Sequence, residues 1–514
     1  MKKKIYIELL FLFALGVATS LSLPPFNYFL INFLSFSLFF VFLIKKSIQH
    51  KNLKLFFVYG WIFGFGYFIT NLYWISISLT FDQNFKFLIP FSVILIPSFL
   101  AIFYGLVSCL FILLKPKKII SSLFVFSLIF GILDFVRGSI LTGFPWNLVA
   151  FSFSNQLEIL SIISIIGSYG FNLFCISLFT SPAVLLIRDK KSDIGVFIFF
   201  IITVITFYAY GSVYNKKFEE ITQKNFDFKV RIIASNISLE RFYKKTDPVT
   251  VIEDLIKISN PSINEKTIFV WPEGILPGIS QNELIKYNDL FKDRFDKNHL
   301  LIIGINSQSD KNGIKKYYNS LSIFNNELQV IDTYNKINLV PFGEFLPLED
   351  ILKYIGLRSL TNNYQSFSSG EKRDIIDLKQ KSFFLKILPL ICYEIIYSGK
   401  LFDNYDFDLI INISEDGWFG QSIGPKQHFA HSIFRAVESG KYVLRSSNNG
   451  IAGIINPLGR IEKSVNFGQS GYIDLESYKK IQPTLFSKYK NKIFGLLILL
   501  YIFLIFSFNR IKNE

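Results

Sequence analysis

Three short stretches place charged or nucleophilic residues directly after strand-like apolar runs. The stretch "IFVWPEGILPG" carries Glu273, and "YNKINLVPFGEFLP" carries Lys336 and Glu344. A third stretch, "LPLICYEIIYSG", carries Cys392 and Glu394. Folds built from strands and helices place their sites at strand ends and in the loops that follow them. We therefore expect these five residues to meet at one site.

These residue types suit acyl transfer without a histidine. A thiol has an ordinary pKa of about 8.5, so Cys392 needs a base or a nearby cation to become a nucleophile. A carboxylate can take the proton, and a lysine can stabilise the thiolate and then the oxyanion on the attacked carbonyl. Taken singly, a buried cysteine is usually a small apolar side chain, and a glutamate or lysine is usually solvated. Because all of them lie in aromatic turns with Pro and Gly rather than in polar loops, we expect a functional site.

The composition is too apolar for an ordinary soluble protein. Of the 514 residues, 51% are hydrophobic and 17% aromatic, and the mean hydropathy is +0.38. These values are typical of an integral membrane protein. The net charge of +15 comes from basic residues spread over short loops, which disfavours a nucleic-acid partner. Three scattered cysteines form neither a disulfide framework nor a zinc site.

Long apolar runs predict about eight membrane spans. A spanning helix needs roughly 20 mostly apolar residues. Runs of suitable length lie near 4–22, 28–44, 55–79, 87–114, 119–137, 157–187, 195–213 and 492–509. The first run follows "MKKK" but leads straight into a second span, so we interpret it as an anchor rather than a cleaved signal. Asp134 and Arg137, three residues apart on one helix, are expected to pair with each other rather than to mark a transport pathway.

The charges of the loops predict the topology. Lysine and arginine gather in alternate loops and in both terminal segments, namely "MKKK", 45–54, 115–118, 188–193 and "NRIKNE". Such loops face the cytoplasm, so both termini are predicted to be cytoplasmic. An odd number of spans precedes residue 214, so the polar segment 214–485 is predicted to be periplasmic.

The polar segment reads as a folded domain of its own. Short β-rich runs alternate there with amphipathic helical stretches at 247–259, 281–296 and 426–439, which predicts an α/β or layered α+β domain. We therefore expect three parts: a membrane domain of about seven spans at 1–213, a catalytic domain at 214–485, and a last span with a cytoplasmic tail at 486–514.

Two other motifs could carry chemistry. "GQSIG" (420–424) fits the G-x-S-x-G nucleophile elbow, with Ser422 as the nucleophile. An elbow needs a strand directly before the serine and a helix directly after it, but "EDGWFG" intervenes and Pro425 follows. His428 and His431 in "HFAH" could be zinc ligands, yet no carboxylate completes an H-E-x-x-H pattern. We expect neither motif to be catalytic.

The three stretches resemble the signature blocks of the nitrilase (carbon–nitrogen hydrolase) superfamily. "WPEG", "YNKINLVPFGEFLP" and "CYE" occur in that order. Together with the predicted spans, the chain resembles the bacterial apolipoprotein N-acyltransferase family over essentially its whole length. Other stretches that resemble this family are "LPPF" (23–26), "GFGYFITNLYWI" (64–75), "FPWN" (144–147), "GSYGFN" (167–172) and the segment 416–450.

The resemblance implies a fold and a set of roles. The fold would be a polytopic helical membrane bundle with a four-layer αββα nitrilase-like domain outside the membrane. Glu273 would be the general base, Lys336 the oxyanion stabiliser and Cys392 the nucleophile. Supporting residues would be Glu344, Tyr393 and Glu394, and substrate contacts would come from Trp418 and Phe419. No metal or cofactor is implied.

The implied activity completes lipoprotein maturation at the bacterial inner membrane. A fatty acyl chain would pass from a phospholipid, through a Cys392 thioester, to the amine of the diacylglyceryl cysteine of an apolipoprotein. The residues alone leave open a membrane-tethered amidase or nitrilase that uses water as acceptor. They also leave open a transporter or binding protein with an inactive domain, which the intact Glu273, Lys336 and Cys392 set disfavours.

Two segments carry further expectations. "SEDGWFG" (414–420) departs from the Asn-Asp-Ala type of sequence expected before Trp-Phe-Gly, so Glu415 and Gly417 are expected to alter a loop near the acyl pocket. The segment 345–367 mixes large apolar residues with Lys and Arg, which favours an arm that dips into the membrane interface and gates lipid entry.

Overall fold

The computed structural model describes residues 2–243, 246–311, 314–347, 354, 366–380 and 383–510. The chain divides into two compact units. A helical unit comprises Met1–Glu219, Gln421–Ala430 and Thr484–Glu514, and a strand-rich unit comprises Glu220–Gly420 and His431–Pro483. Most of 345–367, the predicted gating arm, lies outside the described residues.

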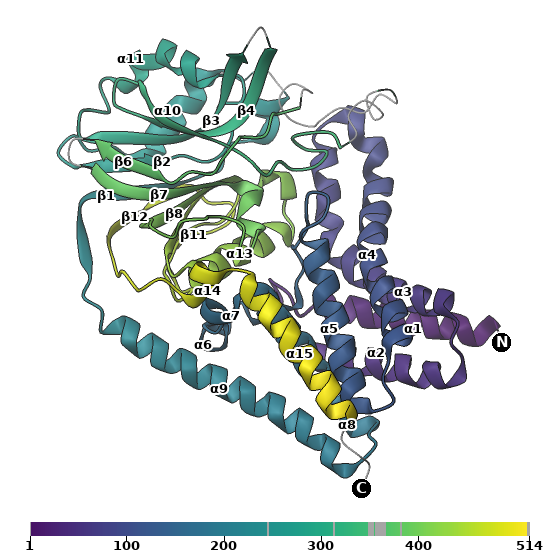
Figure 1. Ribbon diagram of the computed structural model, residues 1–514. Coiled ribbons are helices and arrows are strands. Elements are labelled where there is room, and N and C mark those ends of the chain that lie inside the picture. Colours follow the sequence, from purple (N-terminus) through teal and green to yellow (C-terminus); the bar gives the residue numbers. More distant parts are fainter. Residues whose placement is uncertain are drawn as a thin grey trace. The chain divides into compact units, whose positions relative to one another are not determined.

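The helical unit is built from eight long apolar helices (Figure 1). They are α1 (Lys2–Ser20), α2 (Leu30–Gln49), α3 (Leu53–Leu72), α4 (Ile89–Leu114), α5 (Ile119–Arg137), α7 (Ile163–Thr180), α9 (Ile194–Glu219) and α15 (Lys492–Arg510). Among the described residues, seven helical stretches are long and apolar enough to cross a membrane, and they correspond to the last seven of the eight predicted runs. The first run forms α1. This helix is not among the seven stretches, because the lysines at its start and Glu8 make it more highly charged.

Glycines let three of these helices approach closely. A β-carbon on Gly16 of α1 would lie 2.0 Å from the Phe63 carbonyl oxygen of α3. A β-carbon on Gly60 of α3 would lie 2.2 Å from the Tyr104 carbonyl oxygen of α4. Because helices in lipid associate through close packing rather than the hydrophobic effect, these small residues define the α1–α3–α4 contacts.

The two charged residues of α5 pair as the sequence predicts. Arg137 Nη2 lies 2.9 Å from Asp134 Oδ1, and both side chains are buried. Asn172 Nδ2 of α7 donates to the other Asp134 oxygen at 2.8 Å, and Arg137 donates to the Phe144 carbonyl at 2.5 Å. With its charges compensated and hydrogen-bonded, this pair fastens α5 to α7 and to the chain after α5.

Gln427 is the polar centre of the segment Gln421–Ala430. Its Oε1 accepts from Trp74 Nε1 at 3.3 Å and from Trp146 Nε1 at 2.9 Å, while its Nε2 donates to Asn71 Oδ1 at 3.2 Å. The two indole rings lie 5.0 Å apart. The neighbouring His428 stacks on Trp146 at 5.2 Å, which is a packing role. Within the described ranges, no three His, Cys, Asp or Glu side chains gather as a metal site would require.

The strand-rich unit contains, among its described residues, a 12-stranded sheet that divides into two halves. One half has the order β5-β4-β3-β2-β1 with β12 on the far side of β1, and the other has β6-β7-β8-β9 extended by β10 and β11. In the described part of the chain, the strand pairing that joins the halves is that of Ala234 and Ser235 of β1 with Ser447 and Asn448 of β9. The strands of the first half are β1 (Lys224–Ser235), β2 (Thr267–Val270), β3 (His299–Lys311), β4 (Ile314–Phe324), β5 (Val330–Asn335) and β12 (Gly471–Tyr478). Those of the second half are β6 (Ile376–Gln380), β7 (Phe383–Ile391), β8 (Leu409–Glu415), β9 (Tyr442–Asn448), β10 (Ala452–Ile455) and β11 (Ile461–Val465).

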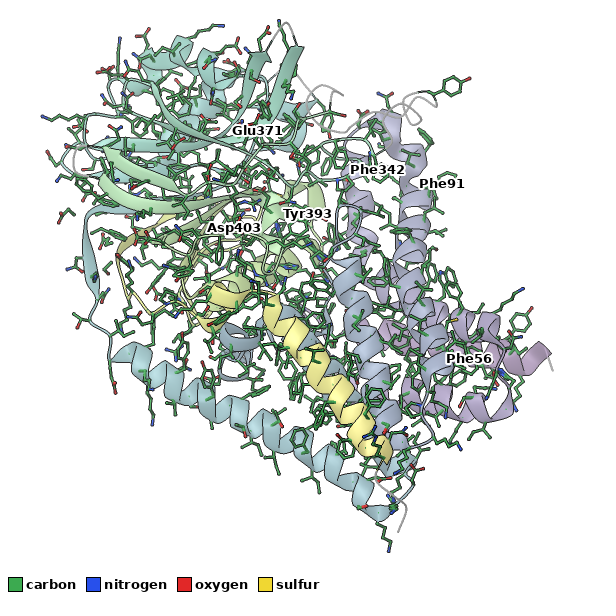
Figure 2. The ribbon with its side chains drawn as sticks, viewed as in Figure 1. Phe56, Phe91, Phe342, Glu371, Tyr393 and Asp403 are labelled. Carbon is green, nitrogen blue, oxygen red and sulfur yellow. The ribbon has the colours of Figure 1, made fainter. Side chains whose placement is uncertain are left out.

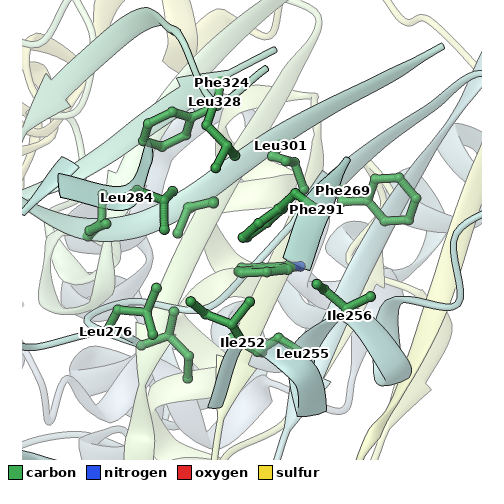
Figure 3. Close-up of a cluster of buried hydrophobic side chains, with 14 of the residues drawn as sticks. Ile252, Leu255, Ile256, Phe269, Leu276, Leu284, Phe291, Leu301, Phe324 and Leu328 are labelled. Atoms are coloured by element: carbon green, nitrogen blue, oxygen red, sulfur yellow. The ribbon is translucent and has the colours of Figure 1, made fainter. Parts of the chain in front are cut away.

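Helices cover these strands to give the predicted αββα domain. Helix α10 (Pro248–Ser259) starts where the Asp247 side chain accepts from the Val249 N–H at 3.1 Å. Its apolar face packs with β2 and β3 around the buried Trp271 (Figure 3). Helix α13 (Gly424–Ser439) buries Phe434 and Val437.

One predicted helix is broken. The stretch 281–296 forms the 3₁₀ helix η6 (Gln281–Tyr287) and the short α11 (Asn288–Phe291). A capping box between Ser280 and Glu283 starts η6, and Leu284 and Phe291 bury their side chains in the same core. The apolar pattern therefore predicted the buried face correctly, while the tight capped turn shortened the helix.

Candidate active site

Cys392 lies on a strained turn at the end of a buried strand. Strand β7 ends at Ile391, and Cys392 begins the 3₁₀ helix η8 (Cys392–Ile396). The φ of Cys392 is +47°, in the left-handed region that residues with a β-carbon rarely adopt. Such strain persists only where surrounding contacts hold it, and it concentrates at functional sites. Tyr393, labelled in Figure 2, follows the thiol directly and is also buried.

Glu394 supplies the contacts that hold this turn. Its carboxylate accepts from the Ile391 N–H at 2.9 Å, the Ile337 N–H at 3.0 Å and the Tyr334 hydroxyl at 2.7 Å. Arg373 Nη2 lies 2.5 Å from the same carboxylate. Burial would raise the pKa of Glu394, but Arg373 and the hydrogen bonds hold it below its ordinary value of 4.5. An ionised Glu394 therefore ties the turn after β7 to the loop after β5.

Lys336, the first residue of that loop, is buried between two carboxylates. Its Nζ lies 3.0 Å from Glu273 Oε1 and 3.0 Å from Glu344 Oε1. Asn319 of β4 bridges the same two oxygens, at 2.7 Å from Glu273 and 2.6 Å from Glu344. Burial alone would lower the pKa of Lys336, but the two carboxylates outweigh it and hold the pKa well above 10.5. A fixed, protonated ammonium is thus available at the site.

The two carboxylates have different surroundings. Glu273, which follows β2, accepts the N–H of Glu415 on its second oxygen at 2.9 Å. Glu344 accepts the Val340 N–H at 2.8 Å within its own turn. Burial raises the pKa of Glu344 above 4.5, although Lys336 opposes the shift. Glu344 therefore keeps a proton more readily than a solvated glutamate does.

The thiol is protonated at rest. Burial, and then the charge of Glu273, raise the pKa of Cys392 well above 9.0 against the opposing effects of Lys336 and a hydrogen bond with Ser414. A buried thiol that interacts with a carboxylate and an ammonium can lose its proton as it attacks, rather than before. The arrangement can perform acyl transfer, with Lys336 placed to stabilise an oxyanion.

The structure brings the five strand-end residues of the sequence prediction into one network. Trp418 and Phe419 are half-buried in the 3₁₀ helix η9 (Asp416–Phe419), where Trp418 packs 5.0 Å from the Phe242 ring. Ser422 accepts the Gly424 N–H at 3.0 Å at the start of α13, and it belongs to the helical unit. No strand leads directly into it in the described part of the chain, so the elbow motif is not formed.

Sequence reasoning missed several polar residues of the site. Besides Asn319 and Arg373, a buried Arg445 on β9 binds both oxygens of Asp416 at 2.8 Å, and Asp416 accepts the Ser414 hydroxyl at 2.7 Å. The signal for Arg445 was present, because an arginine interrupts the apolar run "YVLRSSN". Asn319 and Arg373 carry no comparable signal in their stretches.

Comparison with known families defines the class. Residues 15–180 match the apolipoprotein N-acyltransferase N-terminal domain, and residues 255–478 match the carbon–nitrogen hydrolase family. The chain is thus a membrane protein that carries a nitrilase-like catalytic domain. Apolipoprotein N-acyltransferases from Brucella melitensis and Rhizobium leguminosarum are 30% and 31% identical to it, and each alignment covers 90% of this chain and 88% of the relative. The chain belongs to the apolipoprotein N-acyltransferase family and is an acyltransferase.

Among solved structures, Nit3 of Saccharomyces cerevisiae, a member of the nitrilase superfamily, is similar to this chain. The two share 20% sequence identity over 50% of this chain and 91% of Nit3, with a TM-score of 0.33.

Proposed function

We propose that the protein transfers a fatty acyl chain from a membrane phospholipid to the N-terminal amine of a diacylglyceryl-modified apolipoprotein. The single observation that carries the chemistry is the buried Lys336 ammonium, 3.0 Å from both Glu273 and Glu344 and in electrostatic contact with the Cys392 thiol. The acceptor follows from the family to which the chain belongs. The donor follows from a thiol nucleophile in a membrane protein, where the acyl esters at hand are phospholipids.

In the first half-reaction, Glu273 takes the Cys392 proton as sulfur attacks the ester carbonyl of the lipid. The carbonyl oxygen becomes an oxyanion, which Lys336 stabilises. Collapse breaks the bond to the glycerol oxygen, and Glu273 returns the proton to that oxygen. The products are a Cys392 thioester and a lyso-phospholipid.

In the second half-reaction, the acceptor amine attacks the thioester carbonyl. Glu273 takes a proton from the amine, Lys336 again holds the oxyanion, and collapse expels the sulfur. The proton returns to Cys392, which leaves an N-acylated lipoprotein and a free thiol. The thioester persists between the two steps only if water is excluded.

The other predicted residues support these steps. Glu394 holds the Cys392 turn, and Glu344 fixes Lys336 through the contact of its carboxyl group with the Lys336 Nζ. Tyr393 lies between the nucleophile and Glu394 in the chain, and Trp418 with Phe419 provides apolar surface for the acyl chain. No step requires a metal or a cofactor.

We further propose that residues 1–213 and 486–514 lie in the bacterial inner membrane and that 214–485 form the periplasmic catalytic domain, with both termini cytoplasmic. A site at the membrane surface lets the lipid react without leaving the bilayer. Extracting an acyl chain into water would cost about 0.8 kcal/mol per CH₂.

The ping-pong scheme predicts acylation without any acceptor. The purified wild type, mixed with phospholipid alone, should gain the mass of one acyl chain and release one lyso-phospholipid, because the thioester forms in the first half-reaction. Intact-protein mass spectrometry measures the first product and lipid analysis the second.

Two variants complete this experiment. Cys392→Ala should gain no mass and release no lyso-phospholipid. Ser422→Ala should behave as the wild type, since the proposed mechanism gives Ser422 no role and its hydroxyl accepts the Gly424 N–H at the start of α13. Acylation that survives Cys392→Ala would overturn the catalytic assignment.

A further inference from the structure

The last residue of β8, Glu415, has a buried carboxylate that three donors hold. The carboxylate accepts the Gly417 N–H at 2.9 Å, Asn448 Nδ2 at 2.7 Å and the guanidinium of Arg241. Both members of the Arg241–Glu415 ion pair are nearly inaccessible to solvent, at 2% and 1% exposure of their side chains. Arg241 also donates to the Ser238 carbonyl at 2.9 Å. Loss of either partner would leave a buried charge uncompensated.

Glu415 and Gly417 depend on each other sterically. A β-carbon on Gly417 would lie 2.7 Å from Glu415 Oε1, closer than two such atoms approach. The carboxylate cannot move aside without losing its hydrogen bonds. An asparagine at 415, one methylene shorter than glutamate, would remove the contact with Oε1. The other two close neighbours of that β-carbon, Asn449 Nδ2 and Leu239 Cγ, lie at 3.0 Å and would remain. The effect of a side chain at 417 therefore depends in part on the residue at 415.

The same residue contacts the proposed base. The backbone N–H of Glu415 donates to Glu273 Oε2 at 2.9 Å, while Glu273 Oε1 faces Lys336 and Asn319. This peptide lies at the last β8–β9 pair, Glu415 with Asn448, where the ladder ends. Beyond that pair, side-chain contacts rather than strand pairing hold the backbone, so the anchored Glu415 carboxylate fixes the direction of the N–H.

We propose that Arg241, Glu415 and Gly417 form a positioning set for Glu273. The set aims the Glu415 N–H at Glu273 Oε2 and so orients the carboxylate that takes the Cys392 proton. It also ties the chain after β1 to the site, because Phe242 next to Arg241 packs on Trp418. The inference rests on the proposed role of Glu273 as general base.

The experiment measures single-turnover acylation with phosphatidylethanolamine in detergent micelles, as a function of lipid concentration. Gly417→Ala should slow the maximal acylation rate at least roughly tenfold, because small misplacements of a catalytic group are costly. The lipid concentration for half-maximal rate should stay unchanged. In a Glu415→Asn background, the same Gly417→Ala substitution should cost less than about threefold, since the clashing carboxylate is gone. Arg241→Met should also slow the maximal rate.

Two control variants separate positioning from stability. Gly471→Ala adds a β-carbon where nothing lies within 4 Å and should change neither rate nor thermal midpoint. Arg231→Met breaks the Arg231–Asp474 ion pair of β1 and β12, so it should lower the thermal midpoint and leave the rate per folded molecule unchanged.

Three results would count against the assignments. If Gly417→Ala costs the same, within about twofold, in both backgrounds, the positioning set is overturned. If the variants lower only the thermal midpoint, as Arg231→Met does, it is also overturned. Acylation that persists in Cys392→Ala would instead remove the proposed function itself.

Discussion

The Lys336 ammonium pairs with two carboxylates and interacts electrostatically with the Cys392 thiol. Glu273 and Glu344 both lie 3.0 Å from its Nζ, so the cluster contains one more acidic group than it has cations. The raised pKa of Glu344 reduces this imbalance, because a protonated Glu344 needs no counter-ion. The side chain that we propose as the oxyanion stabiliser thus also compensates negative charge in the buried cluster at rest.

Lys336→Met separates these two roles. Loss of the ammonium should slow acylation roughly 10²–10³-fold, as removal of an oxyanion-hole donor does. It should also destabilise the fold by about 3–5 kcal/mol, because the carboxylates lose their buried partner. Adding Glu344→Gln should recover part of the thermal midpoint without recovering lyso-phospholipid release. Recovery of both together would mean that Lys336 is only structural.

The η8 turn shows how a short element can be specified by one of its own carboxylates when that carboxylate has partners far away in the sequence. The sequence predicted a site at the strand end because "CYE" follows an apolar run. It could not predict that Glu394 receives Arg373, 21 residues away, or Tyr334, 60 residues away. Such pairs exist only once strands β5 and β7 and the chain before β6 are assembled. For the same reason, the pairing of Arg241 with Glu415, 174 residues apart, was not predicted, although Glu415 itself was expected to alter a loop near the acyl pocket.

The lowered pKa of Glu394 makes the turn sensitive to acid. A group whose pKa is depressed by folding contributes stability above its ordinary value of 4.5, and this contribution is lost as the pH falls through the depressed pKa. In Glu394→Gln, the thermal midpoint should therefore decrease less on acidification from neutral pH to below 4.5 than in the wild type. The exposed Glu327→Gln is the matched control and should keep the wild-type acid sensitivity. Equal acid sensitivity in Glu394→Gln and the wild type would contradict the assignment.

At the scale of the whole molecule, the membrane spans were predicted from hydropathy and the topology from the charges of the loops. Apolar runs need no tertiary information to be recognised, so the seven described stretches that are long and apolar enough to span a membrane were predictable from length and composition. The αββα domain was predictable in class, whereas its edge strands were not. The exposed β11, "IEKSV", has charges at two of its five positions and no apolar face. Its assignment depends on the partner strand β10.

The topology itself remains a prediction, and reporter fusions test it. A reporter inserted at residue 230 and one fused to the C-terminus should give opposite signals, since the positive-inside rule places them on opposite faces. A fusion in the basic loop 45–54 is the control and should agree with the C-terminal one. Identical signals from residue 230 and the C-terminus would contradict this topology, because they would show that an even number of spans separates the two positions.

Gln427 accepts hydrogen bonds from two tryptophans of the helical unit, and these two indoles provide an intrinsic spectroscopic signal. The chain has five tryptophans, and two of them, Trp74 and Trp146, are buried with their rings 5.0 Å apart and inclined by 43°. Indole transitions at that separation couple, and their combined circular dichroism in the near ultraviolet depends on the angle between the rings. Because the Gln427 side-chain amide accepts from both indole N–H groups, the near-ultraviolet circular dichroism reports whether the segment Gln421–Ala430 is packed against the two tryptophans. The protein therefore carries a native chromophore pair that needs no added dye.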